Sequence, residues 1–273
     1  MWNSFRAESF KLAKRPATWL LLALALSLGL IFTYLVPYAG YAAGTGGVRS
    51  GRGLPALLPD RLVGNAIGGL PVFLGAITLI LGVLVVGGEY GAGTWKTLLV
   101  QGPSRMTVYV GKLLALAAAV LVLVLTMFGI GAVTTAIIAA AESQPMRWPG
   151  VADLAAGVGA GWLIASMWTA LGVVLAVALR GVALPIGLGL VWLLAVQNLL
   201  AVIAAPLLAW VASLQKVLPG PNAGSLAAAL GSTSDTPGVA ALVGGGRATL
   251  VVALYLVAFV VTAGVLLNRR DVV

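Results

Sequence analysis

The amino-acid sequence predicts an all-α integral membrane protein. Of its 273 residues, 61% are hydrophobic and 8% are charged, whereas soluble domains average roughly 45 to 50% apolar and about 25% charged residues. Six charge-free runs of 21 to 35 residues follow one another along the chain, and about 20 apolar residues suffice for a helix to cross a bilayer. Barrel strands would instead be segments of about 10 residues with alternating polarity. We therefore expect six transmembrane helices in a single transmembrane domain over residues 1–273.

The first expected element is a helix over residues 1–16 that lies in the membrane interface. Trp2, Phe5 and Phe10 are interspersed with basic residues, and Pro16 ends or redirects the helix. An apolar ridge with basic flanks is typical of a helix at the membrane surface. A solvated tail that carries a positive-inside signal is the alternative.

Each charge-free run is interpreted as one span. The run over residues 181–215 is too short for two helices of about 20 residues and a turn, so one long helix is expected there, bent near Pro185 or Pro206. Proline and glycine break residues 216–247 into short apolar pieces, which predicts short re-entrant or interfacial helices before the last span. The six expected spans cover residues 17–36, 66–87, 113–139, 155–179, 182–210 and 248–267.

The distribution of basic residues predicts the orientation of these spans. Six spans place both termini on one side of the membrane, and this side carries ten of the 16 basic residues. Four of the ten precede the first span, which usually dominates topology. Because basic residues mark the cytoplasmic side, both termini are expected in the cytoplasm.

Several kinds of chemistry are disfavoured by the residues present. The chain has no cysteine and no histidine, which removes disulfides, thiol nucleophiles and most transition-metal ligands. All seven acidic residues lie at or beyond the ends of the expected spans, which argues against catalysis within the membrane and against a proton-coupled carrier. We expect no catalytic residue, no metal site and no nucleic acid partner.

The longest polar break between two spans is GGEYGAGTWKTLLVQGPSR, residues 87–105. Its glycines, threonines and lysine are also common in phosphate-binding loops, which require the pattern G-x-x-x-x-G-K-[ST]. Trp95 occupies the position of the last glycine before Lys96, so this chain is not expected to bind a nucleotide here. On these residues alone, a capped loop that touches only lipid headgroups is the simplest interpretation.

Local helix signals lie within the same break. Gly91 and Gly93 allow a sharp exit from the second span. Thr94 can cap a short helix along the membrane surface, and Ser104 can cap the third span. Such a short helix would present Trp95 as part of a mixed apolar and cationic surface.

Polar residues inside the expected spans are candidates for the lining of a translocation path. Gln197 and Asn198 are adjacent near the centre of the fifth span, and Ser166 and Thr169 lie in the fourth. Buried amides in lipid require partners, and a hydroxyl group can bond to its own helix. Hydrogen bonding within or between helices is therefore the alternative to contact with a substrate.

The stretch over residues 87–115 resembles the segment between the second and third helices of ABC-2 type permeases, the transmembrane subunits of bacterial ABC exporters. In that family an acidic residue and an aromatic precede Gly-Thr, a basic residue followed by Thr-Leu-Leu, a Pro-Ser-Arg turn and a Gly-Lys that enters the next span. The residues in those places here are Glu89, Tyr90, Gly93, Thr94, Lys96, Thr97, Leu98, Leu99, Pro103, Ser104, Arg105, Gly111 and Lys112. The chain departs from the pattern after Tyr90, where it has Gly-Ala-Gly and the family often has bulkier polar residues.

The resemblance implies a cytoplasmic coupling helix between helices 2 and 3 that is bound by a separate ATP-binding cassette ATPase. The ATPase-coupling residues would be Glu89, Tyr90, Gly93, Thr94, Trp95, Lys96, Thr97, Leu99 and Arg105. It also implies two ATPase subunits that hold MgATP, a second permease chain as a homodimer or related pair, and a bacterial cytoplasmic (inner) membrane. The permease itself would hold no cofactor.

The expected cargo is hydrophobic or amphipathic, such as a drug, a peptide or a lipid, because the interior of the bundle is apolar and has few fixed charges. Two other kinds of function are alternatives. A secondary carrier or channel would act without an ATPase partner, and a non-transporting membrane scaffold subunit would bind partners without moving a solute.

Overall fold

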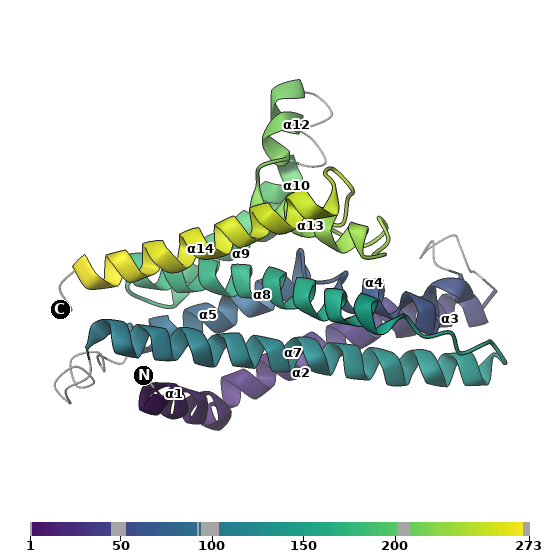
Figure 1. The fold of residues 1–273 in the computed structure, drawn as a ribbon, viewed down its shortest axis with the longest axis horizontal. Coiled ribbons are helices and arrows are strands. Elements are labelled where there is room, and N and C mark those ends of the chain that lie inside the picture. The colour runs from purple at the N-terminus through teal and green to yellow at the C-terminus, as the bar shows by residue number, and fades with distance from the viewer. Residues whose placement is uncertain (1, 45–52, 92, 94–103, 201–207, 270–273) are drawn as a thin grey trace.

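The computed structural model describes residues 2–44, 53–91, 93, 104–200 and 208–269, and within these ranges every regular element is helical (Figure 1). Five of the described helices are long and apolar enough to cross a membrane. The prediction of an all-α membrane protein is therefore confirmed.

A short amphipathic helix precedes the first span. Helix α1 (Trp2–Lys14) ends before Pro16, which occupies the first position of α2 (Pro16–Leu30). Proline is well suited to that position because a helix has no partner for the missing N–H there. The span then continues through the π-helix η1 (Ile31–Leu35) into α3 (Val36–Ala42).

The second span begins later than its expected start at residue 66. Two 3₁₀-helices and a short α-helix come first, η2 (Leu54–Leu57), η3 (Pro59–Arg61) and α4 (Leu62–Ile67). Residues 68–72, which include two glycines and Pro71, separate α4 from the spanning helix. That helix is α5 (Phe73–Gly91).

Three further spans lie close to their expected positions: α7 (Arg105–Ala141), α8 (Val151–Leu179) and α14 (Gly245–Arg269). Ser104 caps α7 as predicted, because its hydroxyl oxygen accepts a hydrogen bond from the backbone N–H of Thr107 at 3.2 Å. At 37 residues, α7 is longer than the roughly 20 residues that a bilayer requires, so it extends beyond the hydrocarbon core.

The region of the fifth expected span is irregular. An apolar helix runs from Ala183 to Leu199. Its three consecutive parts are α9 (Ala183–Leu190), the π-helix η4 (Val191–Val196) and α10 (Gln197–Leu199). Pro185 lies near the start of α9, and Pro206 lies outside the described residues. Leu208 has an extended backbone before α12 (Ala209–Gln215), so one continuous helix does not reach residue 210. The six-span count stays a prediction.

Close backbone approach holds α5 against α8. A Cβ added at Gly82 would overlap the carbonyl oxygen of Thr169, and a Cβ added at Gly172 would overlap the carbonyl oxygen of Leu79. Only glycine permits two helices to come this close. Trp168, which is fully buried, lies in the same interface.

The ends of the helices define two ends of the molecule. Helix α1, the start of α7 and the end of α14 lie together at one end (Figure 1). Toward the other end, α13 (Pro219–Ala229) and the connection after it pack on α4, where the hydroxyl of Ser232 donates to the carbonyl oxygen of Gly64 at 2.6 Å. The end of α8 lies beside the end of α5, because Gly181 packs on Gly87. The chain therefore passes from one end to the other between α8 and α13.

Candidate functional site

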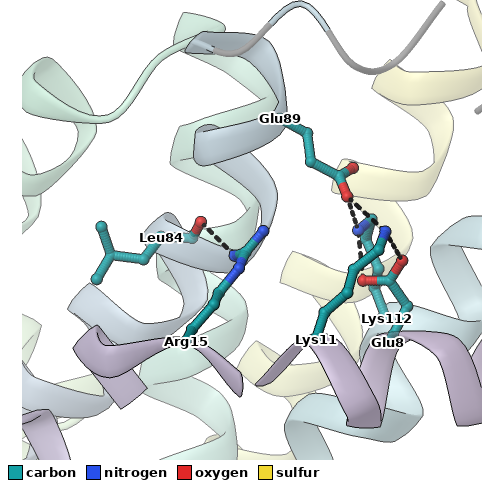
Figure 2. A network of polar contacts seen from close by, with 6 residues as sticks. All are labelled: Glu8, Lys11, Arg15, Leu84, Glu89 and Lys112. Carbon is teal, nitrogen blue, oxygen red and sulfur yellow. Dashed lines mark hydrogen bonds and ion pairs between the residues drawn. The ribbon is translucent and has the colours of Figure 1, made fainter. Parts of the chain in front are cut away.

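Four charged side chains meet where α1 crosses the end of α5 and the beginning of α7. Glu8 and Lys11 come from α1, Glu89 from α5 and Lys112 from α7 (Figure 2). We call these four residues the charge network. They join the two helices on either side of the polar break to the N-terminal helix.

Lys112 is the centre of the charge network. Its ammonium Nζ lies 2.7 Å from Glu8 Oε2 and 2.5 Å from Glu89 Oε1. Lys11 Nζ lies 2.7 Å from Glu8 Oε1 and 3.4 Å from Glu89 Oε1. Two carboxylates thus face two ammonium groups, and the formal charges of the network cancel.

Burial makes these ion pairs costly to break. Lys112 is 0% exposed, Glu89 3% and Glu8 4%. Removing one partner of a buried ion pair leaves an uncompensated charge away from water, which typically costs about 3 to 5 kcal/mol. The charge network therefore holds its three helices together, since separating them would expose or strand a buried charge.

The network also shifts the protonation of its two members on α1. Burial by itself raises the pKa of Glu8, but the ammonium groups of Lys112 and Lys11 outweigh it and hold that pKa below its usual range. Burial alone lowers the pKa of Lys11, but the hydrogen bond and negative charge of Glu8, together with Glu89, leave that pKa raised. Both shifts favour the charged forms.

Two further contacts position α1 over this site. A Cβ added at Gly111 would lie 2.8 Å from Ser4 Cβ, so the glycine lets α1 approach α7 one residue before Lys112. Arg15, which links α1 to α2, donates from Nη1 to the carbonyl oxygen of Leu84 in α5 at 3.2 Å (Figure 2). The Gly-Lys pair thus combines close packing with a buried charge.

The predicted coupling residues divide into a described and an undescribed group. Glu89 belongs to the charge network, half-buried Tyr90 packs against the apolar core, and Arg105 begins α7. Gly93 has a φ of +63°, a left-handed conformation that favours glycine and agrees with the expected sharp exit from the second span. The predicted residues outside the described part of the chain are Thr94, Trp95, Lys96, Thr97 and Leu99. The coupling role itself stays a prediction.

The structure shows the local surroundings of each of the four candidates for a translocation path. Thr169 and Asn198 donate to backbone oxygens of their own helices, those of Ala165 at 2.8 Å and Leu194 at 2.7 Å. The Ser166 hydroxyl on α8 is buried and has no hydrogen-bond partner within the described part of the chain. Gln197 is 7% exposed and packs on Gly220 at the start of α13. The contacts of Thr169, Asn198 and Gln197 lie within or between helices, and contact of any of the four with a substrate stays a prediction.

Sequence reasoning missed that Lys11 and Lys112 pair with Glu89, and that Glu8 pairs with the same two lysines. Two signals were present: a glutamate in an otherwise basic amphipathic segment, and a lysine directly before a 29-residue apolar run. The pairing itself joins residues up to 104 positions apart, which a single sequence does not reveal.

A bundle of long apolar helices with a charge network at one end defines a multi-pass membrane protein. The sequence profile described as ABC-2 family transporter protein matches residues 4–196, more than half of the chain, and the chain therefore belongs to this family. Permeases of this family are the transmembrane components of ABC transporters and generally pair with ATPase subunits. A comparison with curated proteins found no match.

Proposed function

We propose that this chain is the permease subunit of an ATP-binding cassette exporter in a bacterial cytoplasmic membrane, with both termini in the cytoplasm. Two separate ATPase subunits would bind MgATP, and two permease chains would form the pathway between them. The cargo would be hydrophobic or amphipathic. Family membership and the apolar bundle support this proposal.

The charge network is the observation that carries the proposal. The end of α5 and the start of α7 flank residues 92–104, the stretch expected to contact the ATPase. Glu89 and Lys112 link these two helix ends across 2.5 Å. On α1, Glu8 pairs with Lys112 and Lys11 pairs with Glu89, so both helix ends are linked to α1. A force applied to the connection between α5 and α7 would therefore move three helices together.

The mechanism follows from this linkage. Closure of the two ATPases on MgATP would shift the connection between α5 and α7, and these helices would rock the bundle relative to the second permease chain. Because α8 packs on α5 with close backbone contacts at Gly82 and Gly172, it would follow the same motion. Such interfaces rearrange as rigid bodies, since packed cores do not deform continuously.

The experiment is co-purification of the chain with the ABC ATPase encoded nearest to its gene. The wild type should yield a complex that hydrolyses ATP. The double variant Glu89→Ala with Lys96→Glu should lose or uncouple this hydrolysis. The single variant Lys96→Glu keeps the buried ion pair of Glu89, so it shows the effect of losing the contact with the ATPase alone. Asp60→Ala with Lys216→Glu is a matched control that changes the same charges in other parts of the chain.

Two results would contradict the proposal. If no ATPase associates with the wild type, the chain is instead interpreted as a carrier, a channel or a scaffold. If the Glu89 and Lys96 variant associates and hydrolyses ATP normally, the coupling site lies elsewhere in the chain.

A further inference from the structure

A cavity of about 470 Å³ lies between the first span and the start of the second, far along the bundle from the charge network. Its walls come from α2 and η1 on one side and from α4 and α5 on the other. Met127 of α7 contributes to its lining, and residues 235–237 lie at its edge. This volume is within the range of small-molecule binding sites, roughly 300 to 1,000 Å³.

The lining is mostly apolar and opens outward. Leu28, Phe32, Phe73 and Met127 supply its apolar surface. Phe32 is 64% exposed and Phe73 is 50% exposed, so the cavity opens at the surface of the spans, where lipid would lie. A ligand with an apolar body could enter from the bilayer.

Local backbone features create the space. Four of the lining residues are glycines, Gly29, Gly64, Gly68 and Gly69, which contribute no side chains. Phe32 and Thr33 belong to the π-helix η1, and a single π-helical turn within an α-helix often marks a functional site. Met127 can adjust its shape to different ligands, because its side chain is unbranched and flexible.

One side chain gives the cavity a charge preference. Asp235 is the only charged residue among its described lining residues, and it forms no salt bridge within the described part of the chain. It is exposed at the edge of the cavity. The aromatic rings of Phe32 and Phe73 favour cations as well, through their negative faces.

We propose that this cavity binds an amphipathic cation, with the apolar part of the ligand between Leu28 and Met127 and its positive charge near Asp235. The inference deepens the proposed function and rests on it for the further step, in which the bound cation is exported. Binding itself requires only this chain.

Binding should be measured on the chain alone, in nanodiscs of zwitterionic phosphatidylcholine, with radiolabelled tetraphenylphosphonium as the probe. Tetraphenylborate has the same shape and the opposite charge. Saturable binding of the cation above that of empty nanodiscs is expected for the wild type, and not for the anion. The variants Asp235→Asn, Thr33→Phe and Asp60→Asn then test the cavity.

Asp235→Asn should weaken cation binding about three- to fivefold, as expected for a partly solvated ion pair. This exposed site contributes little packing, so the variant should remain folded. Thr33→Phe should abolish saturable binding by filling the cavity, and its thermal unfolding should match that of the wild type. Asp60→Asn removes an acidic residue that does not line the cavity and should bind like the wild type.

The proposal is overturned if the wild type binds no more cation than empty nanodiscs, as would follow if lipid or a second copy of the chain filled the cavity. Equal affinities of the wild type and Asp235→Asn also overturn it, as does an equal loss in Asp60→Asn. A failure here would leave the ATPase complex intact, whereas failure of the proposed function would appear in co-purification.

Discussion

At the scale of single residues, the charge network ties three helices together through buried ion pairs. Lys112 is fully buried and lies between two carboxylates from different helices. Placing the charges of Glu8, Glu89 and Lys112 away from water costs several kcal/mol per ion before their attraction is counted. The network is therefore better understood as a device that fixes the relative positions of α1, α5 and α7 than as a source of net stability.

Replacement of Lys112 should destabilise the protein strongly. Lys112→Met leaves Glu8 and Glu89 buried with only Lys11 to balance them, and the expected loss is about 3 kcal/mol in the free energy of unfolding. Thermal unfolding of the purified chain in detergent would measure it. Arg6→Met removes the same charge from an exposed position on α1 and should unfold like the wild type. Equal unfolding temperatures for the two variants would contradict this account.

The pKa shifts on α1 predict a pH range of greatest stability. The pKa of Glu8 is lowered from 4.5 in the folded protein, so its contribution is fully present above that pH and is lost as pH falls through the lower pKa. The pKa of Lys11 is raised from 10.5, so its contribution is present below that pH and is lost as pH rises further.

Thermal unfolding against pH checks this expectation. The unfolding temperature should decrease as the pH falls below about 4.5. In Glu8→Gln, this decrease on the acid side of the curve should be less steep. If the unfolding temperature of the variant decreases as steeply as that of the wild type, other carboxyl groups determine the loss of stability in acid.

At the scale of secondary-structure elements, glycine determines how α5 and α8 meet. Gly82 and Gly172 each face a carbonyl oxygen of the opposite helix, and Gly87 faces that of Gly181 just beyond α8. These contacts leave no room for a side chain, so the two helices are held in one register. Rigid pairing of α5 and α8 is what would let a force on one reach the other.

Addition of one methyl group at this interface tests the pairing. Gly82→Ala should cost about 1 to 3 kcal/mol, because backbone atoms of α8 would have to move. Gly88→Ala lies on the same helix with no atom near the added group, and it should leave stability unchanged or raise it by about 0.5 to 1 kcal/mol. Thermal unfolding of both variants measures the difference, and similar values would contradict tight packing at Gly82.

At the scale of the whole molecule, the path of the chain between α8 and α13 determines its topology. Five described helices are long enough to span a membrane. The contact of Gly181 with Gly87 places the residues just after α8 at one end of the molecule, and the contact of Ser232 with Gly64 places the residues just after α13 toward the other end. The helix over Ala183–Leu199 lies between these two points in the sequence. If it crosses the membrane, the chain has six spans.

Labelling of single cysteines tests this topology, and the natural absence of cysteine provides an unlabelled background. With six spans and cytoplasmic termini, Lys216→Cys should react with a membrane-impermeant maleimide in intact cells. Arg180→Cys should react only after the membrane is opened. Reaction of both on the same side would exclude a crossing between them.

The sequence alone sufficed for the class of the protein and for the approximate positions of five spans. Both depend on the length and continuity of apolar runs, a local property that the bilayer translates directly into helices. The cap at Ser104 and the break at Pro16 were predictable for the same reason, since each acts within a few residues of itself.

The tertiary structure decided which distant residues meet. Glu8 and Lys112 are 104 positions apart, and the glycine contacts between α5 and α8 also join segments far apart in the sequence. The cavity beside η1 likewise combines segments of the first span, α4, α5, α7 and the connection before α14. Local patterns specify how a segment folds, but the contacts between segments depend on how all the helices pack together.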